Sequence, residues 1–219
     1  MLTFEQLKQN EEIRTYIRRA DESLAALGYT EHSFAHVGRV AQTAKYLLET
    51  LHFSEHDVEV AQIAAYLHDI GNLVNRADHS QSGAIMAFRL LDHMGMESED
   101  LATVVTAIGN HDESTGVPVN AIAAALIIAD KCDVRRSRVR NQDVSTFDIH
   151  DRVNYSVSDS RLTLDPASGE LLLALEIETV YSSVMDYFEI FLDRMILCRK
   201  AAESLGLRFR LRINGQTLL

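Results

Sequence analysis

The sequence predicts a mainly α-helical protein with a small β-sheet toward its C-terminal end. From Thr3 to about Arg138, apolar residues recur at the three- and four-residue spacing of helices that bury one face. After Asn141 the period changes to that of strands, and ELLLALEIE places one apolar face at Leu171, Leu173, Leu175 and Ile177. We therefore expect a bundle of about six helices, followed by a small antiparallel sheet with one long helix.

The helical part has recognisable start and stop signals. Thr3 and Gln6 form a capping-box pattern, a break is expected near Asn10, and Gly28 ends the first helical region. Further helices are expected over residues 33–51, 55–67, 80–93, 98–109 and 120–135. Together these segments make up a first predicted domain, residues 1–141.

The remaining residues, 142–219, are expected to form an α+β appendage packed on the first domain. Strands are expected over residues 153–165 and 170–178, and a long helix over residues 180–205. The final stretch, RFRLRINGQTLL, predicts a strand, a type I′ turn at Asn214-Gly215 and a short return strand.

Composition limits where the protein works and what it binds. A net charge of −11 argues against binding to a nucleic-acid polymer or an anionic membrane. The longest apolar run, Ala121 to Ala129, is far shorter than the roughly 20 residues of a membrane span. The N-terminus shows no signal peptide, and two cysteines without CxxC spacing fit a reducing compartment. We therefore expect a cytoplasmic protein.

The stretch AYLHDIGN, residues 65–72, carries an apolar helix directly into a His-Asp pair. A carboxylate removed from water costs several kcal/mol unless it is paired or bound to a metal. Because neighbouring helical residues point about 100° apart, His68 and Asp69 reach one cluster only at a helix end. Gly71 is expected to permit that end.

Four other residues of the same kinds stand where amphipathic helices begin or end: His36, His79, His111 and Asp130. Asp130 directly follows the longest apolar run, so it needs a local reason to be charged there, and a metal supplies one. Imidazole and carboxylate ligands without thiolate suit Fe, Mn, Co, Ni or Zn, with Mg possible.

In this order, and with the flanking sequences HVGRVAQTA, LHDIG and IIAD, the residues resemble the HD superfamily of metal-dependent phosphohydrolases. The resemblance covers about residues 33–133. It implies an HD-type helical bundle that holds two divalent ions through His36, His68, Asp69, His79, His111 and Asp130. In the family, the counterpart of Asp69 bridges the ions; His36, His68 and Asp130 would complete one site, and His79 with His111 the other.

Such a metal pair predicts a hydrolase, with Asp69 and His68 as its catalytic residues. Two divalent ions against two aspartates leave a formal charge of about +2, which suits a phosphate ester. We expect a metal-activated hydroxide to attack a phosphoester or phosphoanhydride of a nucleotide or another small phosphorylated molecule.

The sequence indicates the substrate-binding residues less clearly than the metal ligands. In KCDVRRSRVR, helical spacing would place Lys131, Arg135 and Arg138 in a stripe beside Asp130, although a solvated helix end explains the same charges. Arg39 is a further candidate, with a structural ion pair as the alternative. Asn72 stands where family members often carry Lys or Glu; because Asn cannot act as a general acid or base, the general acid is unassigned.

Two other functions stay open at this point. One is a di-iron oxygenase of the inositol-oxygenase-like branch, which uses nearly the same ligands. The other is a non-catalytic HD sensor whose C-terminal sheet carries an output or dimer contact. The expected partners are a small phosphorylated substrate and, as an open alternative, a second copy of the chain.

Overall fold

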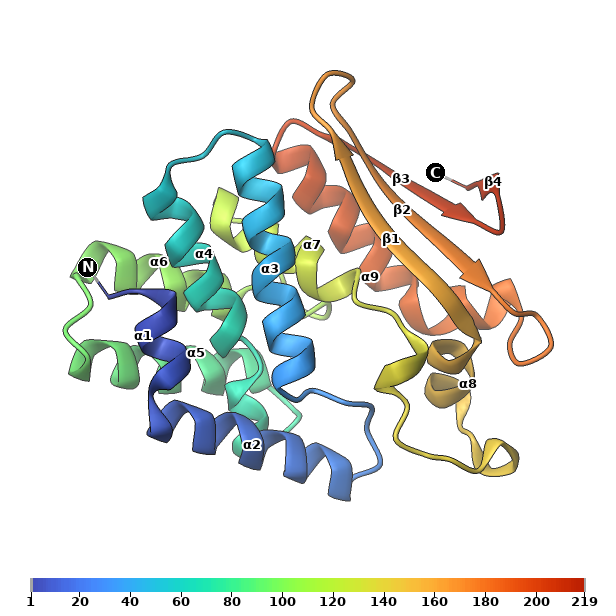
Figure 1. The fold of residues 1–219 in the computed structure, drawn as a ribbon, viewed down its shortest axis with the longest axis horizontal. Helices are drawn as coiled ribbons and strands as arrows, with labels where there is room; N and C mark the ends of the chain where they lie inside the picture. Colours follow the sequence, from blue (N-terminus) through green and yellow to red (C-terminus); the bar gives the residue numbers. More distant parts are fainter. Residues whose placement is uncertain (1, 219) are drawn as a thin grey trace.

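The computed structural model describes residues 2–218, and it consists of a helical body with a four-stranded sheet along one side (Figure 1). The body is built from α1 (Phe4–Gln9), α2 (Glu11–Ala26), α3 (Phe34–Thr50), α4 (Glu55–Leu67), the short 3₁₀ helix η1 (Ile70–Leu73), α5 (His79–His93), α6 (Ser98–Gly109) and α7 (Ala121–Lys131). The predicted capping box at Thr3 is present, and the side chain of Asn10 caps α2 at the predicted break. The mainly helical prediction is therefore confirmed.

The C-terminal part adds two α-helices, two short 3₁₀ helices and the sheet. Its elements are η2 (Arg136–Arg138), η3 (Val144–Thr146), α8 (Ile149–Ser156), β1 (Val157–Asp165), β2 (Glu170–Ile177), α9 (Val184–Ser204), β3 (Arg208–Ile213) and β4 (Gln216–Thr217). The strand order is β1-β2-β3-β4, and the outer pairs are antiparallel, whereas β2 and β3 are parallel. The predicted all-antiparallel sheet is thus wrong at its centre, because α9 returns the chain to the same end of the sheet before β3 begins.

Two helix boundaries also differ from the prediction. Residues 153–156, expected at the start of a strand, form the last turn of α8, which Asp148 caps by accepting from the Asp151 amide. α7 ends at Lys131 instead of near residue 135, and Arg135 has an extended backbone. The continuous apolar run stops at Ala129, and charged residues at 130, 131 and 133 interrupt the sequence that follows.

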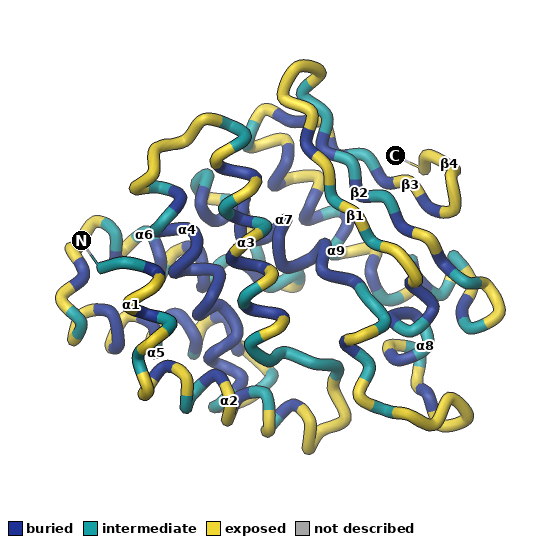
Figure 2. Tube along the Cα trace, viewed as in Figure 1, coloured by how far each residue is buried: buried dark blue, intermediate teal, exposed yellow. Residues whose placement is uncertain are grey.

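The interior consists of two apolar clusters that meet at α7. One lies among α1 to α7; the other lies between α7, α9 and the sheet, and includes Ala124, Ile127 and Ile128 of α7. Figure 2 shows α7 buried along its length. Because both sides of α7 are covered, its sequence is apolar all round, as expected of a fully buried helix.

The division predicted at residue 141 stays a prediction, since α7 contributes to both clusters. Among the helices of residues 2–218, none combines the length and the apolar character needed to cross a membrane.

Candidate metal centre

The six predicted residues lie together where helix ends converge inside the body. They are His36 in the first turn of α3, His68 and Asp69 after α4, His79 at the start of α5, His111 after α6, and Asp130 in the last turn of α7. All six are buried. We refer to them as the His-Asp cluster.

The four histidines are held in the same way. Each Nδ1 lies 2.7–3.1 Å from a protein oxygen: a carboxylate oxygen of Asp133 for His36, and the carbonyls of Ala65, Arg76 and Ile108 for His68, His79 and His111. Because an oxygen can only accept there, Nδ1 carries a proton, and in the neutral ring Nε2 keeps its lone pair. This is the tautomer that a metal ligand requires, fixed by an outer partner.

One half of the cluster surrounds His36 and His68. His36 Nε2 lies 3.3 Å from Asp130 Oδ1, and His68 Nε2 lies 3.2 Å from Asp69 Oδ2. Neither nitrogen has a hydrogen-bond partner although both are buried, which is costly unless a cation occupies the space. Ligand atoms of His36, His68 and Asp130 lie within 4.8 Å of one another, so these residues fit a shared metal ion.

The other half surrounds His79 and His111. Their Nε2 atoms lie 3.2 Å apart, and His79 Nε2 is 3.6 Å from Asp69 Oδ1. Two lone pairs that face each other at this distance repel unless a cation lies between them or beside them. Asp69 therefore presents Oδ2 to His36 and His68, and Oδ1 to His79.

The electrostatics of the cluster favour a positive charge at its centre. Burial lowers the pKa of His68, but Asp69 and Asp130 outweigh it and raise that pKa to about 10. Burial and the charge of His68 lower the pKa of His111 to about 3. Burial opposes the charge of Asp69, yet His68 and His36 hold its pKa well below the usual value. Without metal the cluster thus carries a proton on His68, which a divalent ion would displace.

Two further polar residues orient the cluster. Asp133, which the sequence analysis missed, lies 2.8 Å from His36 Nδ1 and 2.9 Å from Arg135 Nε. Its position three residues after Asp130 was the available signal. Asn72 is buried, and its amide donates to the Asp69 carbonyl at 2.9 Å and to Asp69 Oδ1 at 3.0 Å. Its contact with substrate stays a prediction.

A chain of charges links the cluster to α9. Lys131 Nζ lies 2.8 Å from Asp130 Oδ2 and 2.6 Å from Glu113 Oε2, and Arg194 Nε lies 3.0 Å from Glu113 Oε1. Glu113 directly follows the His111-Asp112 pair, which was a usable signal, whereas nothing in the sequence singled out Arg194. Lys131 is therefore committed to two carboxylates.

The predicted helical stripe of bases is wrong, because α7 ends before it. Arg135 pairs with Asp133 and with Glu31 Oε2 at 3.0 Å. Arg138 is buried and donates to the Glu31 and Asp133 carbonyls. Arg39 lies with its Nε 3.6 Å from Asp133 Oδ1. Arg39, Arg135 and Arg138 thus converge on Asp133 rather than on the cluster.

Gly71 has a different role from the one expected. Added at this position, a Cβ would overlap the His79 carbonyl oxygen and the Gly83 nitrogen. The absence of a side chain lets the start of α5 lie directly against the turn that follows Asp69, and this contact brings His79 to the cluster.

A cavity of about 420 Å³ adjoins the cluster, and we call it the metal-side cavity. Among its lining residues, Arg76 Nη1 lies 4.0 Å from Asp69 Oδ1, and the His32 ring centroid is 5.5 Å from that of His36. The C-terminal part closes it with His150, Asn154, Phe191 and Arg194.

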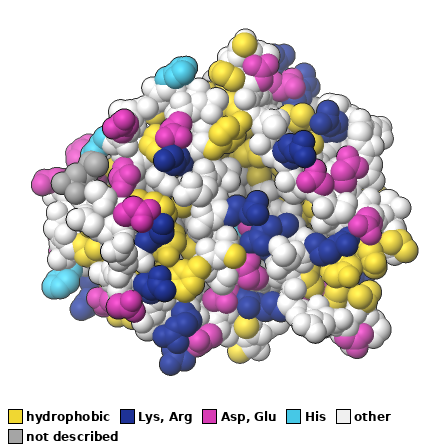
Figure 3. Space-filling model, in the orientation of Figure 1, with side chains coloured by type: hydrophobic (Ala, Val, Ile, Leu, Met, Phe, Trp, Pro, Cys, Tyr) yellow, Lys and Arg dark blue, Asp and Glu magenta, His cyan; other side chains and the backbone are white. Residues whose placement is uncertain are grey.

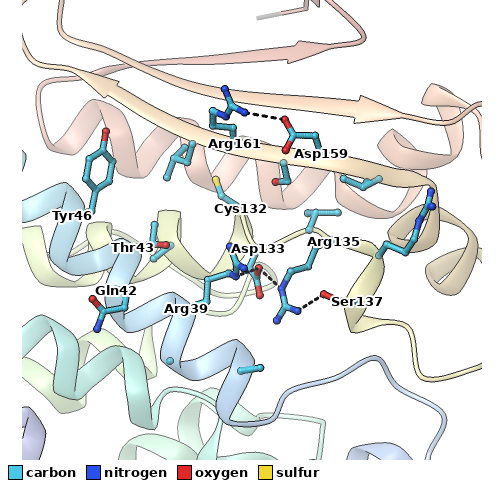
Figure 4. Close-up of a pocket in the computed structure, with 18 of the residues that line it drawn as sticks. Arg39, Gln42, Thr43, Tyr46, Cys132, Asp133, Arg135, Ser137, Asp159 and Arg161 are labelled. Carbon is cyan, nitrogen blue, oxygen red and sulfur yellow. Dashed lines mark hydrogen bonds and ion pairs between the residues drawn. The ribbon is translucent and has the colours of Figure 1, made fainter.

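A second cavity of about 880 Å³ lies between α3 and β1, and we call it the α3–β1 groove. Figure 3 shows basic side chains gathered in a hollow near the centre of this face, and Figure 4 shows the groove with Arg39, Asp133, Arg135 and Arg161 around it. Asp133 lines the groove and also holds His36, so it stands between the groove and the cluster.

Comparison of the sequence with protein-family models agrees with this geometry. Residues 33–138 match the family model of the HD domain. The uncharacterized protein MJ1020 of Methanocaldococcus jannaschii is 25% identical over 213 residues, which cover 86% of this chain and 80% of that protein. A solved structure described as a predicted HD superfamily hydrolase, from an uncultured Thermotogales bacterium, is 26% identical with a TM-score of 0.47, covering 62% of this chain and 75% of that one. The segment that matches the HD model holds all six residues of the His-Asp cluster, so residues 33–138 of this chain form an HD domain.

Proposed function

We propose that this protein is a metal-dependent phosphohydrolase that acts on a small phosphorylated molecule, such as a nucleotide. The HD domain and the buried His-Asp cluster support a metal-dependent hydrolase in general. The observation that carries the proposal is the arrangement of ligand atoms: four Nε2 atoms face one centre, and Asp69 directs one oxygen to each half of it.

Two divalent transition-metal ions fit this arrangement, with Fe, Mn, Co, Ni and Zn as candidates and Mg possible. One would be held by His36, His68 and Asp130, the other by His79 and His111, with Asp69 shared between them. When bound, the ions supply an acidified water molecule and stabilise negative charge on phosphate oxygens.

The protein's own residues keep this centre in one geometry. The Nδ1 contacts fix the four imidazole rings, and the Asn72 amide fixes the Asp69 carboxylate. Glu113 holds Lys131 against Asp130, so that carboxylate stays charged. The catalytic roles of Asp69 and His68 are thus to bind the ions in a fixed orientation.

We place the substrate in the metal-side cavity, whose volume suits a small ligand. Arg76 lies beside Asp69 and packs over the Tyr29 ring at 5.7 Å, so its guanidinium is positioned for a phosphate that reaches the cluster. Arg194 supplies a second guanidinium from α9. In this proposal Arg76 and Arg194 take the role that the sequence analysis assigned to Arg39 and Arg135.

The test is metal analysis of protein purified without added metal, with a panel of nucleoside monophosphates, dinucleotides, cyclic nucleotides and an aryl phosphate. The wild type is expected to contain metal and to hydrolyse at least one of them, whereas Asp69→Ala loses both metal and turnover. Asp92→Ala, at an exposed position of α5, is the matched control and retains both.

Full phosphatase activity in a metal-free Asp69→Ala protein would contradict the proposal. Oxygen consumption with the EPR signal of a coupled Fe(II)/Fe(III) pair would support the oxygenase instead. A metal-loaded protein that binds a ligand but turns nothing over would support the sensor.

The cytoplasmic location and a homodimer stay predictions. Cys132 and Cys198 are free thiols with their sulfur atoms 3.9 Å apart, so the pair could form a disulfide only in an oxidising compartment. Disulfide analysis of protein isolated from its native cells, and light scattering of the purified protein, would test the two predictions.

A further inference from the structure

The α3–β1 groove is built from three parts of the chain that are distant in sequence. One wall is α3, the other is β1, and the segment after α7 lies between them (Figure 4). Small residues form part of its surface, at Ala35, Gly38 and Ala129. The groove is larger than the metal-side cavity, and its volume of about 880 Å³ lies within the range of small-molecule sites.

The charges around the groove are predominantly positive. Four arginines line it, Arg39, Arg135, Arg136 and Arg161, against two aspartates, Asp133 and Asp159. This excess is unusual in a protein with a net charge of −11. A concave surface lined by one sign of charge concentrates ligands of the opposite sign.

Two of these guanidinium groups are available to a ligand. Arg39 on α3 has 60% of its side chain exposed and lies 3.6 Å from Asp133. Arg161 on β1 has 71% exposed and lies 3.6 Å from Asp159. Both contacts are longer than a good hydrogen bond, so both side chains keep N–H donors free for a ligand at the rim of the groove. Arg135, by contrast, already donates to Asp133, Glu31 and Ser137.

Polar hydroxyl groups complete the lining. Thr43 and Tyr46 extend from α3 and Ser160 from β1. The Tyr46 oxygen accepts from the Leu164 amide at 3.0 Å, which leaves its own hydroxyl hydrogen free to donate. Donors therefore line both walls, as recognition of an anionic ligand requires.

The space above Gly38 is open. A Cβ at this position would meet nothing within 4 Å, and the residue is helical, where alanine is favoured over glycine by about 1 kcal/mol. The packing of α3 therefore does not require a glycine at this position. It leaves room for a ligand between α3 and β1.

We propose that the α3–β1 groove is a second binding site, for a phosphorylated small molecule of nucleotide size whose phosphates lie between Arg39 and Arg161. The site is separate from the metal-side cavity, because Asp133 and α3 stand between the groove and the His-Asp cluster. The ligand is bound there without being cleaved.

The experiment is calorimetric titration of ATP into the full chain after removal of metal with a chelator, so that turnover plays no part. The wild type is expected to bind ATP, and the Arg39→Gln/Arg161→Gln double variant to bind at least about tenfold more weakly, since two charge-assisted contacts are lost. Gly38→Leu is expected to block binding by filling the groove, whereas Gly38→Ala, its matched control, retains it.

Arg76→Gln distinguishes the two cavities, because Arg76 lines the metal-side cavity but not the α3–β1 groove. Binding that is unchanged in Arg76→Gln and lost in the groove variants supports the second site. Binding that is lost in Arg76→Gln and retained in the groove variants overturns it, as does a wild type that does not bind ATP. Because no hydrolysis is measured, these results stand apart from the test of the phosphohydrolase.

Discussion

Asp133 shows how much of the centre depends on residues outside the cluster. Its carboxylate holds the His36 imidazole at 2.8 Å while it pairs with Arg135, and His36 contacts both Asp69 and Asp130 through Nε2. A carboxylate at Nδ1 fixes the ring and makes the opposite nitrogen a stronger metal ligand. Asp133 would therefore influence a bound metal ion without contacting it.

Replacing Asp133 with alanine is expected to weaken metal binding by about 10- to 100-fold, because the His36 ring loses its partner. Asp133→Asn keeps an oxygen that accepts from His36 Nδ1, so its metal affinity should fall less than that of Asp133→Ala. Chelator competition measures the affinity, and Asp92→Ala serves as the control. An Asp133→Ala protein with wild-type metal affinity would show that the contact has no such role.

The buried histidines make the stability of the metal-free protein depend on pH in opposite directions. Neighbouring carboxylates raise the pKa of His68 to about 10, so its contribution is complete below the unfolded pKa of about 6.5 and is lost as the pH rises toward 10. Burial lowers the pKa of His111 to about 3, so the folded state binds fewer protons than the unfolded state below about pH 6.5. Stability should then fall as the pH drops through that window.

We therefore expect the urea midpoint of chelator-treated protein to be highest near neutral pH. The depressed pKa values of Glu113 and Asp133 add to the loss in acid, because their contribution is present above about pH 4 and disappears below it. Urea unfolding between pH 3 and 10 measures this. A midpoint that kept rising from pH 7 to 10 would contradict the raised pKa of His68.

Helix ends, rather than helix faces, carry the chemistry in this fold. The cluster lies where α3 and α5 begin and where α4, α6 and α7 end. The polar residues of these helices therefore meet at one point, while the apolar faces of the helices remain packed in the core. The contact between η1 and α5 is close, because the Gly71 backbone lies directly against His79 and Gly83. The position of His79 depends on that contact.

Gly71→Ala is expected to lower the free energy of unfolding by about 1–3 kcal/mol or more, since the new methyl group meets backbone atoms that cannot move aside. Gly38→Ala is the matched control, because its methyl group meets nothing and favours the helix by about 0.5–1 kcal/mol. Urea unfolding compares the two variants. Equal stability in both would mean that α5 can shift without cost.

The helical body and the C-terminal part share one interior. α7 packs against helices on one side and against α9 and the sheet on the other. Polar contacts cross the same boundary, since Arg194 of α9 pairs with Glu113 and the Leu164 amide of β1 donates to Tyr46 of α3. The metal-side cavity also needs both parts.

The protein is therefore expected to unfold in a single transition, because separation of the two parts would expose α7 residues such as Ile127 and Ile128. Scanning calorimetry measures this, and the calorimetric and van't Hoff enthalpies should agree. Residues 1–141 expressed alone should lack a cooperative transition. Two resolved transitions would instead support independent domains divided at residue 141.

Patterns along the chain were sufficient for the helical body and for the six clustered residues. Caps at Thr3 and Asn10 and the apolar spacing of α3 to α7 are local signals, and a histidine or aspartate at the end of an apolar helix stands out in the sequence. The parallel pairing of β2 with β3, the end of α7 and the partners of Arg135 and Arg138 were not predictable in this way.

The reason lies in what residue spacing records. Spacing reports which face of an element is apolar, so it predicts that an element exists and which of its sides is buried. It does not report which distant segments meet that face. The carboxylate of Asp133 beside His36, the guanidinium of Arg194 beside Glu113 and the groove between α3 and β1 all arise from such meetings, and these depend on how the whole chain packs.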